Sequence, residues 1–361
     1  MSFPLNFLEH IELASLTTLG IGGPARYFIN ADSENTVVEA IRDARDRNIP
    51  VFILGGGSNL LMADAGFPGV VIKIGLAGLE WEESGGGMLV GAGAGEDWDR
   101  LVRLCVERDL AGIECLSGIP GSVGGTPVQN VGAYGQEVSD VIVSLRAYDR
   151  ETDSIVELSR DDCSFTYRTS LFNSTAKNRY VVLNVTYALT KGGEPAIRYA
   201  ELKQAFEGRL ETPSLAEVRS VVRQIRAGKA MLLTPGDPDC RSAGSFFKNP
   251  IMTEDQFNAL EAAAGERAPR YPAAPGKVKT AAAWLIERAG FPKGYAMGPV
   301  GLSSRHTLAL VNKGGATADD LLRLAREIRA RVEGRFGVKL VPEPVFVGFG
   351  EDLISEFFGY N

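Results

Sequence analysis

The chain of 361 residues is 45% hydrophobic and 23% charged, a profile typical of a globular protein with room for two or three domains. Its 38 basic and 45 acidic residues give a formal net charge of −7 without long runs of either sign, which argues against a nucleic-acid binder or a protein of anionic membranes. The four cysteines have no C-x-x-C spacing and there are only two histidines. We therefore expect no metal site and no disulfide framework, but reduced thiols as in the cytoplasm.

The N-terminal stretch, MSFPLNFLEHIELASL, carries charged residues within its apolar part and has no basic segment. No uninterrupted apolar run of about 18 residues occurs in the chain. We expect neither an export signal nor a membrane span.

Apolar spacing next predicts strands over residues 25–30 and 51–54, on either side of a helix over residues 33–48. The second strand runs into a glycine turn, LGGGSNL, from Leu54 to Leu60. Bare backbone N–H groups in such a turn can surround a pyrophosphate, although a simple chain reversal explains the glycines equally well.

Three short strands over residues 71–74, 79–83 and 88–92 are expected to form an antiparallel meander, followed by a helix over residues 97–108. The glycines just before this helix resemble a dinucleotide fingerprint, but its third glycine is replaced by Glu96. An anion at that helix end would meet acidic side chains, so we reject a Rossmann site.

The most glycine-rich segment is GIECLSGIPGSVGGTPVQNVGAYGQE, from Gly112 to Glu137. Glycine lets backbone N–H groups approach an anion, and the apolar residues between the glycines indicate burial. We predict a ligand-cradling loop, with a run of tight turns as the alternative.

Strands over residues 141–149, 154–158 and 180–189 are expected to form another antiparallel sheet. Between the last two lies FTYRTS, where Arg168 has a guanidinium suited to bidentate binding of a carboxylate, or else is a solvated surface charge. A capping box at residues 214–217 starts a helix that ends at Gly228.

A separate domain is predicted from Lys229 onward. It carries the motif GSFFKNP and helices over residues 253–264, 278–289 and 317–336. The final strand, residues 338–347, holds Glu343 between two prolines, which either fix its carboxyl group in place or merely mark an edge strand.

Seven segments occur together and in order, and through them the chain resembles the UDP-N-acetylenolpyruvoylglucosamine reductase (MurB) family, in the longer subtype that has both the Tyr-Arg loop and a clamp tyrosine. The segments are LGIGGPARYF, LGGGSNLL, GIPGSVGGTPVQNVGAYGQE, FTYRTSLF, GSFFKNP, AAAWLIERAG and VPEPVFVG. The resemblance implies an α+β fold with two FAD-binding subdomains of the vanillyl-alcohol-oxidase type and an α+β substrate-binding domain. Their expected extents are residues 1–72 and 73–228 for FAD, the latter joined by the C-terminal strand 338–361, and 229–337 for substrate.

The resemblance further implies a cytoplasmic, monomeric oxidoreductase with noncovalent FAD. NADPH would reduce the flavin, and UDP-N-acetylenolpyruvoylglucosamine would be reduced to UDP-N-acetylmuramate for peptidoglycan synthesis, and hence for cell-wall biogenesis, cell shape and division. Neither nucleic acid nor a membrane is an implied partner.

By the same resemblance, Ser245 is the proton donor, while Arg168 and a protonated Glu343 stabilise negative charge next to the substrate carboxylate. Residues implied to contact FAD are Gly55, Gly56, Gly57, Ser58, Asn59, Ile119, Pro120, Gly121, Ser122, Gly124, Gly125, Asn130 and Gly132. Residues implied to contact substrate are Tyr167, Tyr199, Lys229 and Asn249. Arg288 stands where the family often carries an amide, so it receives no role.

Two other functions stay open at this stage. A flavin oxidase of the same fold acting on another substrate would not require Ser245, Arg168 and Glu343 together. A nucleotide-sugar binding protein without flavin would not require intact glycine loops.

Overall fold

The computed structural model describes residues 5–359 of the chain, which form two compact units. The first unit comprises the residues up to His10, Arg26–Gly56 and Gly69–Ala227, and the second comprises Ile11–Ala25, Gly57–Pro68 and the chain from Gly228 onward. The first four residues of the N-terminal stretch, on which the export prediction partly rests, lie outside the described range. The three-part domain division stays a prediction.

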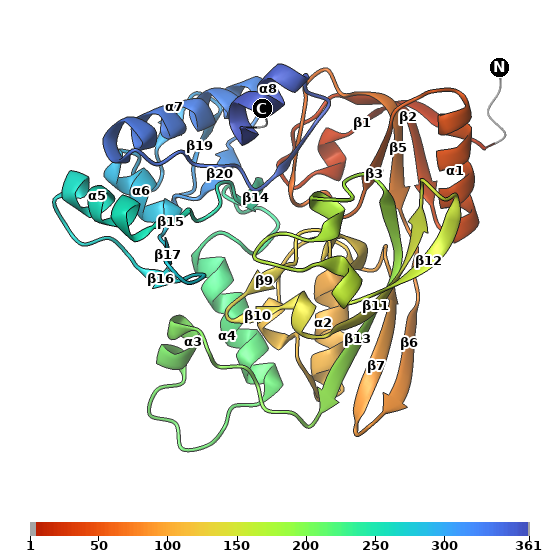
Figure 1. Ribbon diagram of the computed structural model, residues 1–361, viewed down its shortest axis with the longest axis horizontal. Coiled ribbons are helices and arrows are strands. Elements are labelled where there is room, and N and C mark those ends of the chain that lie inside the picture. The colour runs from red at the N-terminus through yellow and green to blue at the C-terminus, as the bar shows by residue number, and fades with distance from the viewer. Residues whose placement is uncertain (1–4, 360–361) are drawn as a thin grey trace. The chain divides into compact units, whose positions relative to one another are not determined.

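The first unit is built mainly from strands (Figure 1). Its helices are α1 (Glu34–Asp46), α2 (Trp98–Glu107), α3 (Ala200–Ala205) and α4 (Leu215–Gly228). Of these, α1, α2 and α4 lie where the sequence predicted them, whereas α3 was not predicted. Its strands, three of which begin or end in the second unit, are β1 (Leu8–Glu12), β2 (Pro24–Ala31), β3 (Val51–Leu54), β5 (Phe67–Ile74), β6 (Leu79–Ser84), β7 (Gly87–Gly93), β8 (Leu110–Ala111), β9 (Gly132–Ala133), β10 (Gln136–Glu137), β11 (Ile142–Asp149), β12 (Ser154–Ser159) and β13 (Tyr180–Lys191).

The strand partners differ from the prediction. The strands expected in a meander and in a second sheet form one antiparallel sheet in the order β12-β11-β13-β7-β6, with β8 paired to β13 (Figure 1). The first of the three expected meander strands, which lies within β5, is not part of this sheet but pairs in parallel with β3, from Val51 opposite Val70 to Leu54 opposite Lys73. Alternating apolar residues specify a strand but not its neighbour. The antiparallel neighbours of β7 confirm that the glycines before α2 are not part of a parallel dinucleotide-binding unit.

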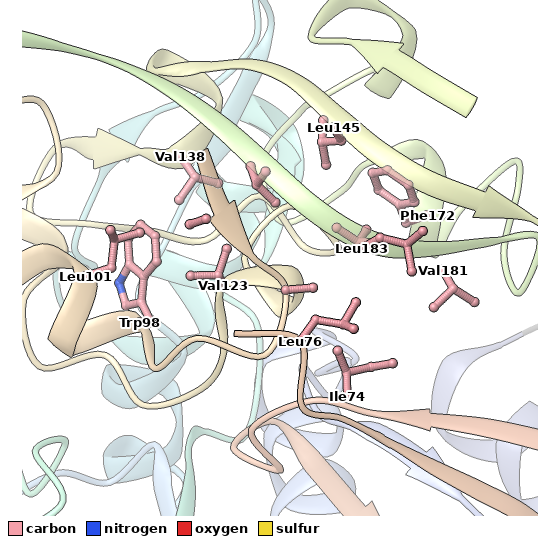
Figure 2. Close-up of a cluster of buried hydrophobic side chains, with 14 of the residues drawn as sticks. Ile74, Leu76, Trp98, Leu101, Val123, Val138, Leu145, Phe172, Val181 and Leu183 are labelled. Carbon is pink, nitrogen blue, oxygen red and sulfur yellow. The ribbon is translucent and has the colours of Figure 1, made fainter. Parts of the chain in front are cut away.

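The core of the first unit joins α2 to the central strands. Trp98 and Leu101 on α2 are buried next to Val123 of the glycine-rich segment (Figure 2). The indole N–H of Trp98 donates to the Leu116 carbonyl at 3.1 Å. The glycine-rich segment is therefore anchored to α2.

An ion pair closes the end of β11. The buried carboxylate of Asp149 accepts from Nε and Nη2 of Arg179 at 3.0 and 2.7 Å. This bidentate partner lowers the pKa of the Asp149 carboxyl to about 2.

The second unit combines two small antiparallel sheets with helices. Its sheets have the orders β14-β20-β19-β18 and β15-β17-β16. Its helices are α5 (Glu254–Ala264), α6 (Ala282–Arg288), α7 (Ala318–Phe336) and α8 (Glu351–Phe358). Its strands are β4 (Leu60–Met62), β14 (Ser242–Ser245), β15 (Ile251–Thr253), β16 (Tyr271–Pro272), β17 (Lys277–Lys279), β18 (Ala296–Met297), β19 (Val300–Leu302), β20 (Ala309–Asn312) and β21 (Val345–Val347).

Capping chemistry explains the helices that the sequence predicted correctly. Thr253 and Thr317 each cap a helix, α5 and α7, in a reciprocal box with the third helical residue. The helix predicted over residues 278–289 is wrong at its start, because Lys277–Lys279 form β17 and the helix begins only at Ala282.

The predicted final strand over residues 338–347 is also shorter than expected. Only Val345–Val347 form a strand, because Pro342 and Pro344 have no N–H to donate to a ladder. This strand, β21, pairs in parallel with β4, which follows the LGGGSNL turn. The expectation that the C-terminal strand joins the second FAD-binding subdomain stays a prediction, like the rest of the domain division. Within residues 5–359, no helix is both long enough and apolar enough to cross a membrane.

Candidate functional site

Two glycine segments that are far apart in the sequence touch within the first unit. A Cβ atom on Gly56 would lie 2.4 Å from the Gly121 Cα and 2.8 Å from the Ser122 nitrogen. A Cβ atom on Gly55 would lie 2.8 Å from the Ser122 Oγ. Since real Cβ atoms do not approach a backbone this closely, Gly56 has to be glycine for the two backbones to meet, whereas a side chain at Gly55 would press only on the Ser122 side chain.

Ser122 lies where these segments meet. Its backbone forms a bridge with Asp97, and the neighbouring Gly121 carbonyl accepts from the Trp98 N–H at 3.1 Å. The side chain is only 6% exposed, and its Oγ has no hydrogen-bond partner within residues 5–359. A buried hydroxyl normally has a partner, so this one is suited to a ligand's oxygen.

Asn130 adopts a positive φ of 45° and is buried in the same loop. Its amide nitrogen donates to Glu137 Oε2 at 2.8 Å and to the Thr166 carbonyl at 3.1 Å, and its oxygen accepts from the Ser139 N–H at 3.2 Å. These contacts give Asn130 a role in holding the loop. Its predicted contact with FAD stays a prediction.

Arg168 is held against this loop in a left-handed conformation, with φ of 55°. Its Nη2 donates to the Gly132 carbonyl at 2.8 Å, and its guanidinium carbon lies 5.3 Å from the centre of the Tyr167 ring. A positive φ is unfavourable for a residue with a side chain, by about 1–2 kcal/mol. The fold thus maintains a strained backbone at one of the predicted catalytic residues.

Tyr199 precedes the short helix α3 and is 42% exposed. Its ring meets the ring of Tyr134 edge-on, with 5.5 Å between the centroids. Tyr134 lies near the end of the glycine-rich segment, so the predicted substrate tyrosine packs on the loop predicted to hold FAD.

In the second unit, the structure brings Ser245 and Glu343 onto neighbouring segments. Ser245 ends β14, and the next residue, Phe246, accepts through its carbonyl from the Glu343 N–H at 2.9 Å. The Lys248 N–H donates to the Val341 carbonyl at 2.9 Å, which extends the pairing. Ser245 and Glu343 are both half-buried.

Asn59 of the LGGGSNL turn contacts the same segment. Its side-chain amide donates to the Glu343 carbonyl at 3.4 Å, and its own carbonyl accepts from the Val345 N–H at 3.0 Å. The second unit therefore joins the end of the glycine turn to the Pro-Glu-Pro segment. Gly57, Ser58 and Asn59 belong to this unit, whereas Gly55 and Gly56 belong to the first.

The other substrate residues have less specific surroundings. Asn249 accepts through Oδ1 from the Ala282 N–H at 3.0 Å, a contact that helps to start α6. Lys229 is half-buried directly after α4. Arg288 pairs with Glu266 and lies 5.6 Å from the Trp284 ring, which gives it a structural role on the surface.

One residue near the glycine turn was missed by the sequence reasoning. Lys73 lies on β5 opposite Leu54, and its Nζ donates to the Gly55 carbonyl. Burial lowers the pKa of its ammonium group. The available signal was a lysine inside the apolar run VVIKI, residues 70–74.

Known proteins match the chain over nearly all of its length. Residues 25–159 match the family model described as FAD binding domain, and residues 237–347 match that described as UDP-N-acetylenolpyruvoylglucosamine reductase, C-terminal domain. A UDP-N-acetylenolpyruvoylglucosamine reductase of Thermobifida fusca is 48% identical over 352 residues, which cover 95% of this chain and 98% of the relative. The corresponding protein of Streptomyces coelicolor is 47% identical and covers 96% of this chain and 91% of its own.

A solved structure agrees with these matches. The crystal structure of the UDP-N-acetylenolpyruvylglucosamine reductase (MurB) from Thermus caldophilus superimposes with a TM-score of 0.65 at 25% identity. The similarity covers 95% of this chain and 100% of the other. The predicted α+β fold with an FAD-binding part is confirmed.

Proposed function

The chain belongs to the UDP-N-acetylenolpyruvoylglucosamine reductase family, and from this premise we propose which residues carry the reaction. The protein is an FAD-dependent oxidoreductase that uses NADPH to reduce UDP-N-acetylenolpyruvoylglucosamine to UDP-N-acetylmuramate in peptidoglycan precursor synthesis. When bound, FAD supplies the hydride that it takes from NADPH to the terminal carbon of the enolpyruvyl group.

The residues present fit FAD. The touching glycine segments at Gly55–Gly56 and Gly121–Ser122 offer backbone close to a ligand, and the buried Ser122 hydroxyl is available as a donor. Backbone N–H groups freed of Cβ atoms suit a pyrophosphate. We assign these residues to the pyrophosphate, and the rest of the predicted FAD set to the surrounding contacts.

Ser245 is the proposed proton donor. Once hydride has reached the terminal carbon, the adjacent carbon has carbanion character, and a proton must be added there to complete the saturated lactyl ether. An alcohol can protonate so basic a centre when it is held within hydrogen-bond distance. The Ser245 hydroxyl gives up its proton and must regain one from solvent before the next cycle.

Arg168 and Glu343 are the proposed stabilisers of the same charge. The Arg168 guanidinium can bind the substrate carboxylate, and Glu343 in its protonated form can donate a hydrogen bond to it. The observation that carries this assignment is the hydrogen bond from Glu343 N–H to the carbonyl of Phe246, which fixes Glu343 next to the residue that follows Ser245.

Tyr167, Tyr199, Lys229 and Asn249 are the proposed contacts with the UDP-sugar. The 42% exposure of Tyr199 leaves a face of the ring for a ligand, in keeping with a clamp over the diphosphate. We also propose that the enzyme is cytoplasmic, like the nucleotide substrates of the reaction, and that it is a monomer. Light scattering at micromolar concentration tests the monomer.

The deciding experiment separates the two half-reactions by flavin absorbance. In Ser245→Ala, NADPH should bleach the flavin at the normal rate, while reoxidation by UDP-N-acetylenolpyruvoylglucosamine under anaerobic conditions should fall about 100-fold or more. Ser355→Ala, at an exposed position of α8, is the matched control and should behave as wild type. Normal reoxidation in Ser245→Ala would remove Ser245 from its role.

A further inference from the structure

Lys73 is a half-buried cation, and the contacts of its side chain include no negatively charged group. Its neighbours on β5, Val71, Ile72 and Ile74, are at most 4% exposed. Within residues 5–359, the only polar contact of its side chain is the hydrogen bond from Nζ to the Gly55 carbonyl. A carbonyl is neutral, so the ammonium has no anion to compensate for its loss of solvent, and burial lowers the pKa of Lys73 accordingly.

The position of this contact is informative. Gly55 is the residue whose Cβ position falls 2.8 Å from the Ser122 Oγ, and that hydroxyl has no hydrogen-bond partner within residues 5–359. An ammonium group can donate three hydrogen bonds, and the Lys73 ammonium uses one of them for the Gly55 carbonyl. Two donors with unused hydrogen-bonding capacity, the buried Ser122 hydroxyl and the half-buried Lys73 ammonium, thus lie beside one glycine of the turn. A bound anion would accept from both.

The charge of a pyrophosphate also calls for a nearby cation. A pyrophosphate bridge carries two negative charges, whereas a glycine cradle supplies only the partial charges of its N–H groups. The protein as a whole carries a formal charge of −7, so attraction for such an anion has to be local.

We propose that Lys73 binds the pyrophosphate of FAD and supplies the positive charge that the glycine cradle lacks. This inference rests on the assignment of Gly55–Gly56 and Gly121–Ser122 to the pyrophosphate. It makes the strand β5 part of the cofactor site, in addition to the two glycine segments.

The competing explanation is that Lys73 only ties down the turn through the Gly55 carbonyl. Three substitutions separate the two explanations. Lys73→Arg keeps the charge and a donor, Lys73→Gln keeps a donor without the charge, and Lys73→Met keeps neither. A role through charge predicts that Gln and Met variants fail alike, whereas a role in tying the turn predicts that Gln behaves as wild type.

The measurement is the dissociation constant of FAD for the apoprotein, followed by quenching of flavin fluorescence at several salt concentrations. Hydrogen bonds to charged groups contribute about 1.5–3 kcal/mol, so Lys73→Gln and Lys73→Met should each weaken FAD binding about 10- to 150-fold. Lys73→Arg should stay within a few-fold of wild type. The affinity of the Gln and Met variants should also depend less on salt, because they lack one screened attraction.

Lys191→Met is the control for loss of one positive charge at a distance. Lys191 ends β13 with a side chain that is 60% exposed, and its nearest acidic partner is Glu83. Thermal unfolding of each apoprotein checks that the variants fold. An FAD affinity of Lys73→Gln equal to that of wild type would overturn the proposal, as would an unchanged affinity of Lys73→Met. Failure of the wild type to bind FAD would instead overturn the assignment of the glycine cradle.

Discussion

Removing the Ser122 hydroxyl should stabilise the apoprotein and weaken FAD binding, two effects of opposite sign from one atom. Ser122 is 6% exposed and its Oγ has no hydrogen-bond partner within residues 5–359. In the apoprotein this buried hydroxyl has lost water without gaining a partner. Ser122→Ala removes the hydroxyl and leaves the backbone contacts of residues 121–123 in place.

The size of both effects follows from hydrogen-bond energetics. An unsatisfied buried polar group costs about 1–3 kcal/mol, so the alanine variant should gain about 1 kcal/mol after some relaxation. That gain corresponds to a melting temperature about 2 °C higher for a unit of this size. With FAD bound, the same hydroxyl would donate to a charged phosphate oxygen, and its loss should raise the FAD dissociation constant about 10-fold.

The assay compares thermal unfolding of apoprotein and FAD-loaded protein, together with the FAD dissociation constant. Ser117→Ala is the matched control, because Ser117 is fully buried nearby and its Oγ donates to the Glu114 carbonyl at 2.6 Å. Its removal should destabilise the apoprotein by about 0.5–1.5 kcal/mol. The reasoning about Ser122 fails if Ser122→Ala destabilises the apoprotein as Ser117→Ala does, or if it binds FAD with unchanged affinity.

Three further results are expected. Gly56→Ala should lower both stability and FAD affinity by about 1–3 kcal/mol, because its Cβ would lie 2.4 Å from a neighbouring backbone atom. The control, Gly334→Ala, lies in open space on α7 and should stabilise the protein by about 0.5–1 kcal/mol in urea unfolding. The pKa of Asp149 is about 2, below its ordinary 3.8, so the charged carboxylate should stabilise the fold by about 1–2 kcal/mol above about pH 4, and this stabilisation should be lost towards pH 2. In urea unfolding, Asp149→Asn should therefore differ most from wild type at pH 5. An equal difference at pH 2.5 would contradict the ion-pair explanation. Arg168→Ala and Glu343→Gln should both slow flavin reoxidation by substrate while NADPH still reduces the flavin, and a loss of FAD affinity with normal reoxidation would make them structural.

Local sequence was sufficient for most helices and strands but not for their partners. The capping boxes of α5 and α7 and the length of β3 depend on residues a few positions apart, which the sequence displays directly. The partner of β5 depends on which apolar faces meet in the folded chain, and the alternation of apolar and polar residues along a strand does not identify its neighbour. The strand predicted over residues 338–347 was too long for a different reason, because the prediction gave more weight to the apolar residues than to Pro342 and Pro344.

The glycines of the candidate site could be picked out from the sequence, but Lys73 beside them could not. Gly56 and Gly121 are visible as glycines in the sequence, and the structure brings them into contact in the first unit. That they contact FAD stays a prediction. Lys73 could not be associated with them, because only the parallel register of β5 and β3 places it opposite Leu54 and so beside Gly55. Likewise, the contact of Asn249 with the start of α6 required the position of that helix.

Backbone contacts place the proposed catalytic residues of the second unit, and this makes the variants at these positions informative. The segment that follows Ser245 is joined to the Glu343 segment by the bond from Glu343 N–H to Phe246 and by the bond from Lys248 N–H to Val341. Neither bond uses the Ser245 hydroxyl or the Glu343 carboxyl group. Substituting either side chain should therefore leave the pairing of the two segments intact. A slower flavin reoxidation in Ser245→Ala or Glu343→Gln would then report the loss of the hydroxyl or carboxyl group, and not a disturbance of the fold around it.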